Sequence, residues 1–303
     1  MLTTLSSTGL LPETLQYLDV HDCPKLESIT TSFASNSSLG FIQIGNCESL
    51  RSIPQGLHNL SNLQKICNGG CPFIESISEG LNNLSHLHQI HIDHCPGLVT
   101  FAEEGLPSTI FSLVIKKCEE LRALPNCMHK LKSLQELKIL GCPRITSFPE
   151  EGIATNLTSL SIGDPNIYKS LSEWGLHKLT HLRHLEKSGC PDAMSFPEEQ
   201  MGMVLPETLT ELTIAVFPNL KYLSAKGFCN LTCLEVLSIR DCSSLKSFPE
   251  VGLPSSLLQL HIIRCPWLEK QCKRDKGQEW QKIADIPFVM IDGKFIYDPE
   301  EEQ

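Results

Sequence analysis

Apolar residues recur along this chain in one short pattern that starts eleven times. The pattern is an aliphatic residue, two free positions, a second aliphatic, one free position, an Ile-like residue, two free positions and Cys, as in L-Q-Y-L-D-V-H-D-C from Leu15. The copies begin at Leu15, Leu39, Leu63, Leu87, Ile110, Leu134, Leu157, Leu182, Leu209, Leu234 and Leu257. They are therefore 23 to 27 residues apart, which makes the chain a repeat protein.

A period of about 20–29 residues with L-x-x-L-x-L is the signature of a leucine-rich-repeat solenoid. Within each copy the stretch x-x-L-x-I-x-x alternates apolar and free positions, as in a half-buried strand. We expect an α/β horseshoe of about eleven repeats, with a parallel sheet on the concave face. The returns between strands should be irregular or short helices, because they are short and rich in turn residues.

Four of the expected core positions hold a residue that the template does not predict. Asn68 and Lys187 replace the Ile-like residue of their strands, whereas Pro165 and Gln271 replace later apolar positions. Asn68 and Lys187, together with the 27-residue eighth copy that carries the extra Q-M-G-M-V around Met201, are expected to be local defects or insertions in an otherwise regular ladder.

Ser and Pro mark the turn that follows the Cys of many copies. Ser lies two residues after the next apolar position at Ser28, Ser52, Ser76, Ser147, Ser170, Ser195 and Ser247, and Pro follows at Pro54, Pro125, Pro149, Pro197 and Pro249. A hydroxyl that bonds nearby backbone and a residue that cannot continue a helix both favour an irregular turn.

The cysteines follow the repeat rather than a pairing pattern. Nine of the fourteen occupy the same repeat position, once per turn: Cys23, Cys47, Cys71, Cys95, Cys118, Cys142, Cys190, Cys242 and Cys265. Single thiols at one repeat position are typical of small core residues with weak donors. The sequence therefore favours a reducing compartment, and we expect the cytoplasm.

Charge and hydropathy exclude several kinds of partner. The net charge is −10, and no long run of Lys or Arg supplies the basic surface that nucleic-acid binding requires. No stretch approaches the roughly 18 apolar residues of a membrane span. We therefore expect no nucleic acid as partner and no membrane span.

The repeat sets the expected domain boundaries. Residues 1–14 form a lead-in without a cap, 15–270 form the repeat domain, and 271–303 form a C-terminal cap with an acidic tail. Solenoids require a terminal cap, and the segment from Cys265 has helical spacing at Trp280 and Ile283, followed by a strand-like run. Because the first copy lacks a lid, we expect that a domain precedes it or that the chain is a fragment.

The motif L-x-x-L-x-I-x-x-C-x-x-L-x-S-φ-P, together with C-P-W-L from Cys265 and G-Q-E-W-Q-K-I-A-D-I-P from Gly277, resembles one known family. The resemblance is to the C-terminal repeats of plant intracellular nucleotide-binding leucine-rich-repeat disease-resistance receptors of the coiled-coil class. It implies recognition of a pathogen effector or a guarded host protein, and contact with a nucleotide-binding domain in a full-length receptor. The chain lacks G-x-x-x-x-G-K-[ST], so nucleotide binding is not implied for this segment.

The free strand positions are the candidate binding residues, because their side chains are not needed for packing. The candidates are Tyr17, Asp19, Phe41, Gln43, His91, Asp93, Lys116, Lys138, His184, Glu186, Arg240 and His261. Tyr17, Phe41, Val114 and Ile263 are expected to be exposed on this face, which favours a protein partner.

No constellation for chemistry is evident. His91 and Asp93 share a face, and Cys67 lies four residues before Cys71, but zinc requires about four converging ligands. Cys67 should point outward while Cys71 joins the ladder. We therefore predict no metal, no cofactor and no enzymatic activity.

Two other functions remain open at this point. One is the substrate-binding repeat domain of an F-box ubiquitin ligase, and the other is an extracellular receptor ectodomain. The first usually lacks the S-φ-P turn, and the second usually has Asn where this chain has Cys. Recognition of a protein in plant defence remains the leading prediction.

Overall fold

The computed structural model describes residues 3–6, 11–30, 33–34, 37–53, 56–77, 80–101, 103–149, 151–198 and 203–297. Pro54 of the expected turns and 298–303 of the acidic tail lie outside the described residues. The chain divides into two compact units, Met1–Leu157 (unit 1) and Thr158–Gln303 (unit 2).

Unit 1 contains six parallel strands, one for each of the first six sequence copies. They are β1 (Tyr17–His21), β2 (Phe41–Gly45), β3 (Lys65–Gly69), β4 (Gln89–Asp93), β5 (Ser112–Lys116) and β6 (Glu136–Leu140). Each strand begins two residues after the first aliphatic residue of its copy. Neighbouring strands pair in register, so equivalent residues of successive repeats lie side by side.

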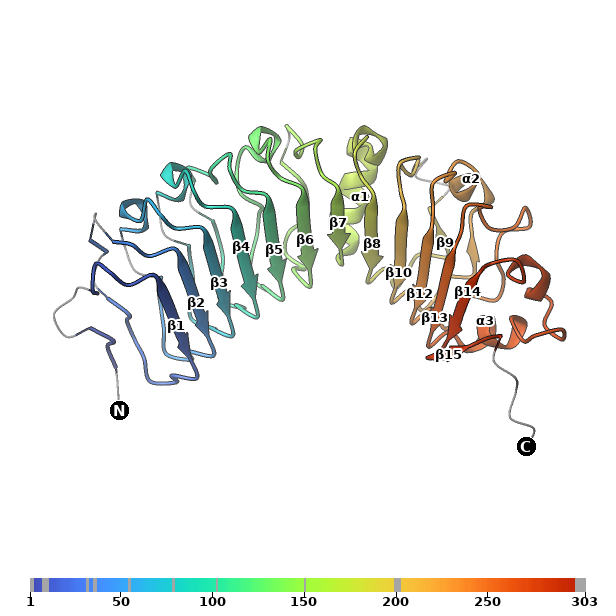
Figure 1. Ribbon diagram of the computed structural model, residues 1–303, viewed down its shortest axis with the longest axis horizontal. Coiled ribbons are helices and arrows are strands. Elements are labelled where there is room, and N and C mark those ends of the chain that lie inside the picture. Colours follow the sequence, from blue (N-terminus) through green and yellow to red (C-terminus); the bar gives the residue numbers. More distant parts are fainter. Residues whose placement is uncertain are drawn as a thin grey trace. The chain divides into compact units, whose positions relative to one another are not determined.

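Unit 2 continues the same plan with the remaining five copies (Figure 1). Its parallel strands are β7 (Ser159–Ile162), β8 (His184–Ser188), β10 (Glu211–Ala215), β12 (Val236–Arg240), β13 (Gln259–Ile263) and β14 (Phe288–Ile291), and β15 (Lys294–Phe295) is antiparallel to β14. Both units are therefore leucine-rich-repeat solenoid, and the predicted fold class and all eleven repeat strands are confirmed.

The repeat strands direct alternate side chains to the core, as the sequence predicts, although Ser112, Val114, Ser161 and Ser238 are buried on the opposite face as well. The second and fourth residues are buried, as Leu18 and Val20 are in β1, whereas Tyr17, Asp19 and His21 are exposed. The buried residues pack against the returns and form the core. The first, third and fifth residues of the strands form the surface called the open face here, which is the face predicted as concave.

A residue with left-handed backbone follows the strand in nearly every repeat, with φ between 46° and 69°. These residues are Asp22, Asn46, Gly70, His94, Lys117 and Gly141 in unit 1, and Gly189, Val216, Asp241, Arg264 and Asp292 in unit 2. Gly, Asn and Asp tolerate this conformation best, which explains why they often precede the Cys. Side chains of neighbouring turns also bond each other: Asn46 Nδ2 donates to Asp22 at 2.9 Å.

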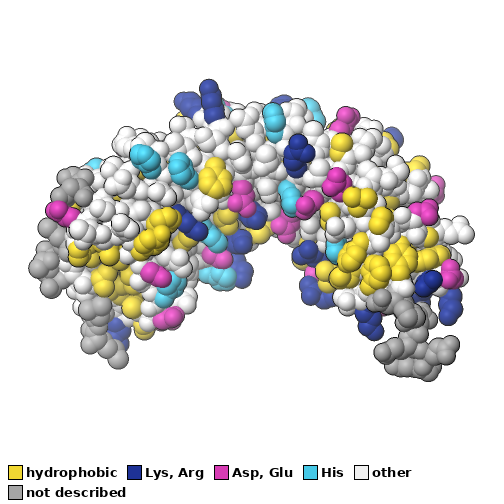
Figure 2. All heavy atoms as spheres, in the orientation of Figure 1, with side chains coloured by type: hydrophobic (Ala, Val, Ile, Leu, Met, Phe, Trp, Pro, Cys, Tyr) yellow, Lys and Arg dark blue, Asp and Glu magenta, His cyan; other side chains and the backbone are white. Residues whose placement is uncertain are grey.

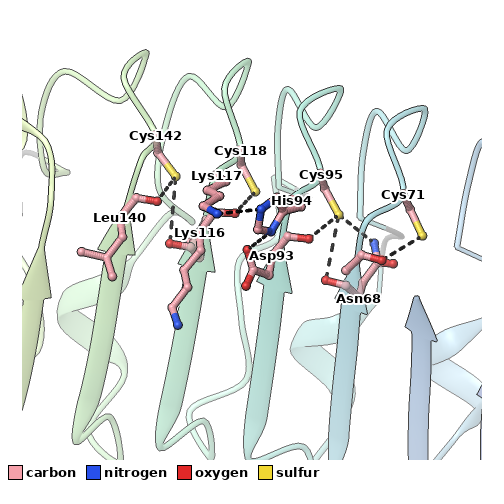
Figure 3. A network of polar contacts seen from close by, with 12 residues as sticks. Asn68, Cys71, Asp93, His94, Cys95, Lys116, Lys117, Cys118, Leu140 and Cys142 are labelled. Atoms are coloured by element: carbon pink, nitrogen blue, oxygen red, sulfur yellow. Dashed lines mark hydrogen bonds and ion pairs between the residues drawn. The ribbon is translucent and has the colours of Figure 1, made fainter. Parts of the chain in front are cut away.

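The cysteine that follows this left-handed residue directs its thiol back toward the strand that precedes it. Figure 3 shows this arrangement in unit 1, where each thiol donates to the carbonyl two residues earlier: Cys71 to Gly69 at 3.5 Å, Cys95 to Asp93 at 3.5 Å, Cys118 to Lys116 at 3.3 Å and Cys142 to Leu140 at 3.7 Å. Burial raises the pKa of Cys71 to about 12 and that of Cys95 to about 11. The thiols therefore stay protonated and can donate. All fourteen cysteines are free.

The returns are short helices and bridges. The helical pieces are η1 (Leu57–Asn59), η2 (Leu81–Asn83), η3 (Met128–Lys130), η4 (Leu176–Lys178) and α2 (Ala225–Phe228). Four of the expected turn serines instead form bridges or short strands between repeats: Ser28 pairs with Thr4, Ser76 with Thr100, Ser247 with Tyr222, and β9 (Ser195–Phe196) with β11 (Tyr222–Leu223). The prediction of an irregular turn at Ser170 was wrong, because this residue lies within the helix Pro165–Trp174.

One return of unit 2 departs from the short pattern. It contains the ten-residue helix α1 (Pro165–Trp174), which lies behind β7 and β8 in Figure 1. Asp164 is its N-cap, with extended backbone, and Pro165 occupies the first turn, where its missing N–H costs nothing. Ile167, Tyr168 and Leu171 are buried at helical spacing. The sequence pattern treated Pro165 as a core defect, whereas it starts a helix.

The tail packs onto the last repeat of unit 2. It contains α3 (Pro266–Gln271) and η6 (Trp280–Lys282), and then β14 pairs with β13. The Glu279 carboxylate accepts a hydrogen bond from the backbone N–H of Phe248 at 2.8 Å and lies 3.0 Å from Lys282 Nζ. The tail residues that have helical spacing thus form only a 3-10 turn at Trp280. The strand-like run that follows them extends the sheet.

Candidate binding surface

The in-register pairing arranges the open face as three lanes, one for each of the first, third and fifth strand residues. Unit 1 carries eight of the predicted site residues: Tyr17, Asp19, Phe41, Gln43, His91, Asp93, Lys116 and Lys138. Unit 2 carries the other four: His184, Glu186, Arg240 and His261. All twelve lie on the open face of their unit.

The first lane of unit 1 begins with an aromatic pair in which Tyr17 is exposed, whereas Phe41, which was also expected to be exposed, is half-buried. The Tyr17 and Phe41 rings stack with their centroids 4.6 Å apart and an interplanar angle of 3°. Tyr17 is 63% exposed although it is a large aromatic residue. An exposed aromatic side chain of this kind is typical of the anchors around which protein interfaces form.

An open depression of about 630 Å³ lies in the open face of unit 1, between β1 and β4. It exists because β2 and β3 end in Gly45 and Gly69, which have no side chain to fill the lane of fifth strand residues. The His21 ring lies over Gly45, where a Cβ would collide with it. Gln43, Lys65, Cys67 and His91 contribute to the lining. The glycines of F-I-Q-I-G and K-I-C-N-G are the sequence signal of this hollow, which the pattern analysis missed.

His91 and Asp93 lie at one wall of the depression. The Asp93 carboxylate lies 2.6 Å from His94 Nδ1, and Lys117 Nζ donates to the other ring nitrogen of His94 at 2.7 Å (Figure 3). His91 Nε2 is buried and has no hydrogen-bond partner among the described residues. Burial lowers the pKa of His91, and the nearby Lys116 ammonium lowers it further. The imidazole of His91 is therefore neutral at pH 7.

Farther along unit 1 the charges are paired. Lys138 Nζ lies 2.8 Å from Glu136, which also accepts a hydrogen bond from Ser112 Oγ at 2.6 Å. Burial would raise the pKa of Glu136, but these two hydrogen bonds outweigh it, so the pKa is lowered. Val114 was expected to be exposed, but it is only 8% exposed, because long side chains flank it in the lane of third strand residues. This expectation was wrong, and Val114 contributes no exposed apolar surface.

On unit 2 three of the four candidate residues contact other residues of the same face. His184 Nε2 lies 2.5 Å from Glu211, and Arg240 Nε donates to Ser238 Oγ at 2.9 Å. The His261 ring lies 5.5 Å from that of Phe288, and burial followed by the charge of Arg240 lowers its pKa. Glu186 and Ile263 are half-buried on the same face. This face therefore offers less unpaired polar surface than that of unit 1.

The described residues contain no group of three or more His, Cys, Asp or Glu side chains that could hold a metal ion. Cys67 is half-buried in the lane of third strand residues, whereas Cys71 is fully buried among the repeat cysteines. The two sulfurs therefore diverge, as expected. Across the same part of the chain, no helix combines the length and the apolar character that a bilayer span needs.

Comparisons with known proteins find similarity to a plant protein and to a solved repeat domain. No protein-family model matches the chain. Over 93 residues, or 31% of the chain, it is 35% identical to an Arabidopsis thaliana protein described as a disease resistance protein. The chain spans only 6% of the length of that relative. Among solved structures it is similar to the leucine-rich repeat domain of the type III effector XopL, with 22% identity, a TM-score of 0.49 and coverage of 70% of this chain and 73% of that chain.

Proposed function

We propose that this chain is the protein-recognition repeat region of a plant innate-immune receptor and binds a pathogen effector or a guarded host protein through its open face. The observation that carries the proposal is the stack of exposed Tyr17 on half-buried Phe41 beside the depression of unit 1. Burying that stack against a partner removes apolar surface from water, and aromatic side chains are the commonest anchors of protein interfaces.

Two further observations support plant defence as the setting. The S-φ-P turns and the C-P-W-L tail resemble intracellular receptors of the coiled-coil class, and the relative described as a disease resistance protein is 35% identical over 93 residues. In such a receptor, residues 15–270 would form the repeat domain, 1–14 its lead-in and 271–303 its cap, and a nucleotide-binding domain of the same polypeptide would be a second partner.

The proposed location is the cytoplasm, and the proposed role involves no catalysis. Eight of the nine repeat thiols are buried in the core and Cys23 is half-buried, and a reducing compartment keeps such thiols unpaired. The open-face side chains bond one another rather than forming a nucleophile, base and orienting group around a reacting atom. Binding therefore depends on shape and charge.

The test is a binding screen of pathogen effectors and host plant proteins, followed by measurement of Kd for the partner that binds the purified chain. The triple variant Tyr17→Ala, His91→Ala, Lys138→Ala removes an aromatic ring, an imidazole and an ammonium from the open face. Its matched control is Phe73→Ala, His58→Ala, Lys130→Ala, which removes the same groups from positions outside this face.

We expect the open-face variant to raise Kd by about 30-fold or more, which corresponds to about 2 kcal/mol. The control should leave Kd within about threefold, and thermal unfolding should be similar for both variants. If the control weakens binding as much as the open-face variant does, the partner binds elsewhere and the proposal is wrong.

A further inference from the structure

A second row of residues in register crosses three repeats of unit 2, on the bends that follow the repeat cysteines. The pairing of β9 with β11 and the bridge between Tyr222 and Ser247 set its register. Met194, Lys221 and Lys246 each come one position before these paired residues, so they also lie side by side. The backbone N–H of Lys221 donates to the Met194 carbonyl at 2.9 Å, which agrees with this register.

The row continues at Trp267, near the start of α3. The Lys246 ammonium lies 5.1 Å from the centroid of the Trp267 ring, and the Lys270 ammonium lies at the same distance. Met194 is 54% exposed and Trp267 is 47% exposed, and all three lysines are exposed. Figure 2 shows basic and hydrophobic side chains next to one another in the region where Figure 1 places α3. Met194, Lys221, Lys246, Trp267 and Lys270 are called the basic row below.

The lysines of the basic row have no counter-ion among the described residues, since none of them forms an ion pair there. The carboxylates of Asp192 and Glu269 are close to the row in sequence, but they pair with none of its lysines. The chain as a whole has a net charge of −10, so this unpaired positive charge is a local feature. Two ammonium groups that converge on one ring repel each other, and an anion beside them lowers that energy.

We propose that the basic row binds an acidic extended segment of a protein partner. Two apolar residues of that segment, four positions apart, pack on Met194 and Trp267, and the carboxylates between them complement the lysines. Neighbouring positions of the row are about 4.8 Å apart, so Met194 and Trp267 are separated by about 14 Å. An extended chain advances about 3.4 Å per residue, and four residues therefore cover nearly the same length.

The basic row is a second surface, separate from the open face. Strands β9 and β11 form a two-stranded sheet of their own, outside the sheet that carries the open face. The inference therefore goes beyond the proposed function and does not depend on it. A protein segment is favoured over an anionic membrane, because the cations lie in a single row between two apolar side chains and the net charge of −10 opposes approach to an anionic bilayer.

The experiment compares two blocked pentapeptides that differ only in charge, Ac-Leu-Glu-Glu-Glu-Phe-NH2 and Ac-Leu-Gln-Gln-Gln-Phe-NH2. Their binding to the full chain is followed by NMR of the indole N–H groups of its three tryptophans, with the Trp267 signal assigned by its loss in Trp267→Phe. We expect the glutamyl peptide to bind with a Kd at least about fivefold lower than that of the glutaminyl peptide, and to shift the Trp267 signal but not that of Trp174. Added salt should reduce the difference.

Variants with fewer cations test the row itself. Lys221→Met and Lys246→Met each remove one charge from an exposed position and keep a long side chain, so each should reduce the preference for the glutamyl peptide, and the double variant should abolish it. Lys178→Met is the matched control, because Lys178 is an exposed lysine whose ammonium lies 5.0 Å from the centroid of the Trp174 ring, outside the row. It should retain the full preference. Thermal unfolding of each variant checks that the chain still folds.

Equal affinity of the two peptides for the wild type, or a preference that survives in the double variant, would overturn the inference. Binding of the wild type to phosphatidylserine vesicles that is lost in the double variant, with no preference between the peptides, would also overturn it and would identify the row as a membrane contact. Each of these results leaves the proposed function standing if the triple open-face variant still loses its partner.

Discussion

Asn68 in unit 1 and Lys187 in unit 2 occupy the same position of the repeat, yet the two units treat their polar core residue differently. Both replace the buried fourth residue of a strand, and they are 3% and 1% exposed. Asn68 Nδ2 reaches only the Cys95 sulfur, at 3.5 Å, and Oδ1 has no partner among the described residues. Lys187 Nζ donates to the carbonyls of Ser188 at 3.0 Å and Asp164 at 3.3 Å.

The difference arises from the elements that lie behind each strand. Asp164 is the N-cap of α1, and the Tyr168 ring of the same helix lies 4.6 Å from the Lys187 ammonium. The helix and its N-cap thus supply a carbonyl and an aromatic face to the buried Lys187 ammonium. In the described part of the chain, no helix is inserted behind β3. A buried polar group costs little when its partners are complete and much more when they are missing. The two residues should therefore respond oppositely to mutation.

The largest effect should come from removing the ring that covers Lys187. Tyr168→Ala removes a buried aromatic side chain that also lies 6.4 Å from Phe196, and it leaves the ammonium beside a cavity. We expect the free energy of unfolding to fall by about 3–5 kcal/mol, as measured by urea denaturation.

Tyr168→Phe is the matched control. It keeps the ring and removes only the hydroxyl, which donates to Met203 Sδ at 3.1 Å. This variant should cost no more than about 1.5 kcal/mol. Equal losses for the two variants would show that the hydroxyl, and not the ring over Lys187, stabilises this part of unit 2.

The next effect should be a stabilisation of unit 1. Asn68→Ile removes the unpaired Oδ1 and restores the apolar lane between Ile44 and Ile92, with which position 68 pairs in the sheet. We expect the free energy of unfolding to rise by about 1–2 kcal/mol in the same assay.

Asn68→Asp keeps the shape of the side chain but buries a carboxylate, so it should destabilise. If Asn68→Ile were destabilising as well, Oδ1 would have a partner in solution, and the contrast with Lys187 would disappear.

The smallest effect is a pH dependence that belongs to Lys187. Burial lowers the pKa of Lys187, so between the folded and the unfolded pKa the unfolded chain binds more protons than the folded one. The penalty for burying Lys187 is complete below the folded pKa, and it disappears as the pH rises toward the unfolded value of about 10.4. Stability from this site therefore increases with pH.

The variant Lys187→Met removes this titration. Between pH 7 and 10 the stability of the chain that keeps Lys187 should rise relative to that of the variant, by at most about 1.4 kcal/mol per pH unit. Both chains should carry Cys190→Ala, because the Cys190 thiol and Lys187 shift each other's pKa. Asn68→Ile serves as the pH-independent control. If the difference in the free energy of unfolding between the two chains does not change with pH, Lys187 ionises in the folded protein as it does in the unfolded one.

Much of the candidate binding surface could be predicted because it follows the repeat. Tyr17, His91 and Lys138 lie on the open face as their strand positions require. The depression was missed because it depends on what is absent, namely the side chains of Gly45 and Gly69, and on the positions that the rings of neighbouring strands then take. Val114 was misjudged since a strand position gives the direction of a side chain but not how far its neighbours cover it.

The sequence by itself determined the eleven strands, their register, the buried thiol ladder and the face that remains free. These features need only a local period, because each repeat packs on its neighbours in the same way. Only the tertiary structure decided how the exceptions are accommodated. Pro165 starts a helix, that helix provides partners for Lys187, and Asn68 keeps an oxygen without a partner among the described residues. These outcomes depend on atoms brought together from different repeats, and a periodic pattern describes only what the repeats have in common.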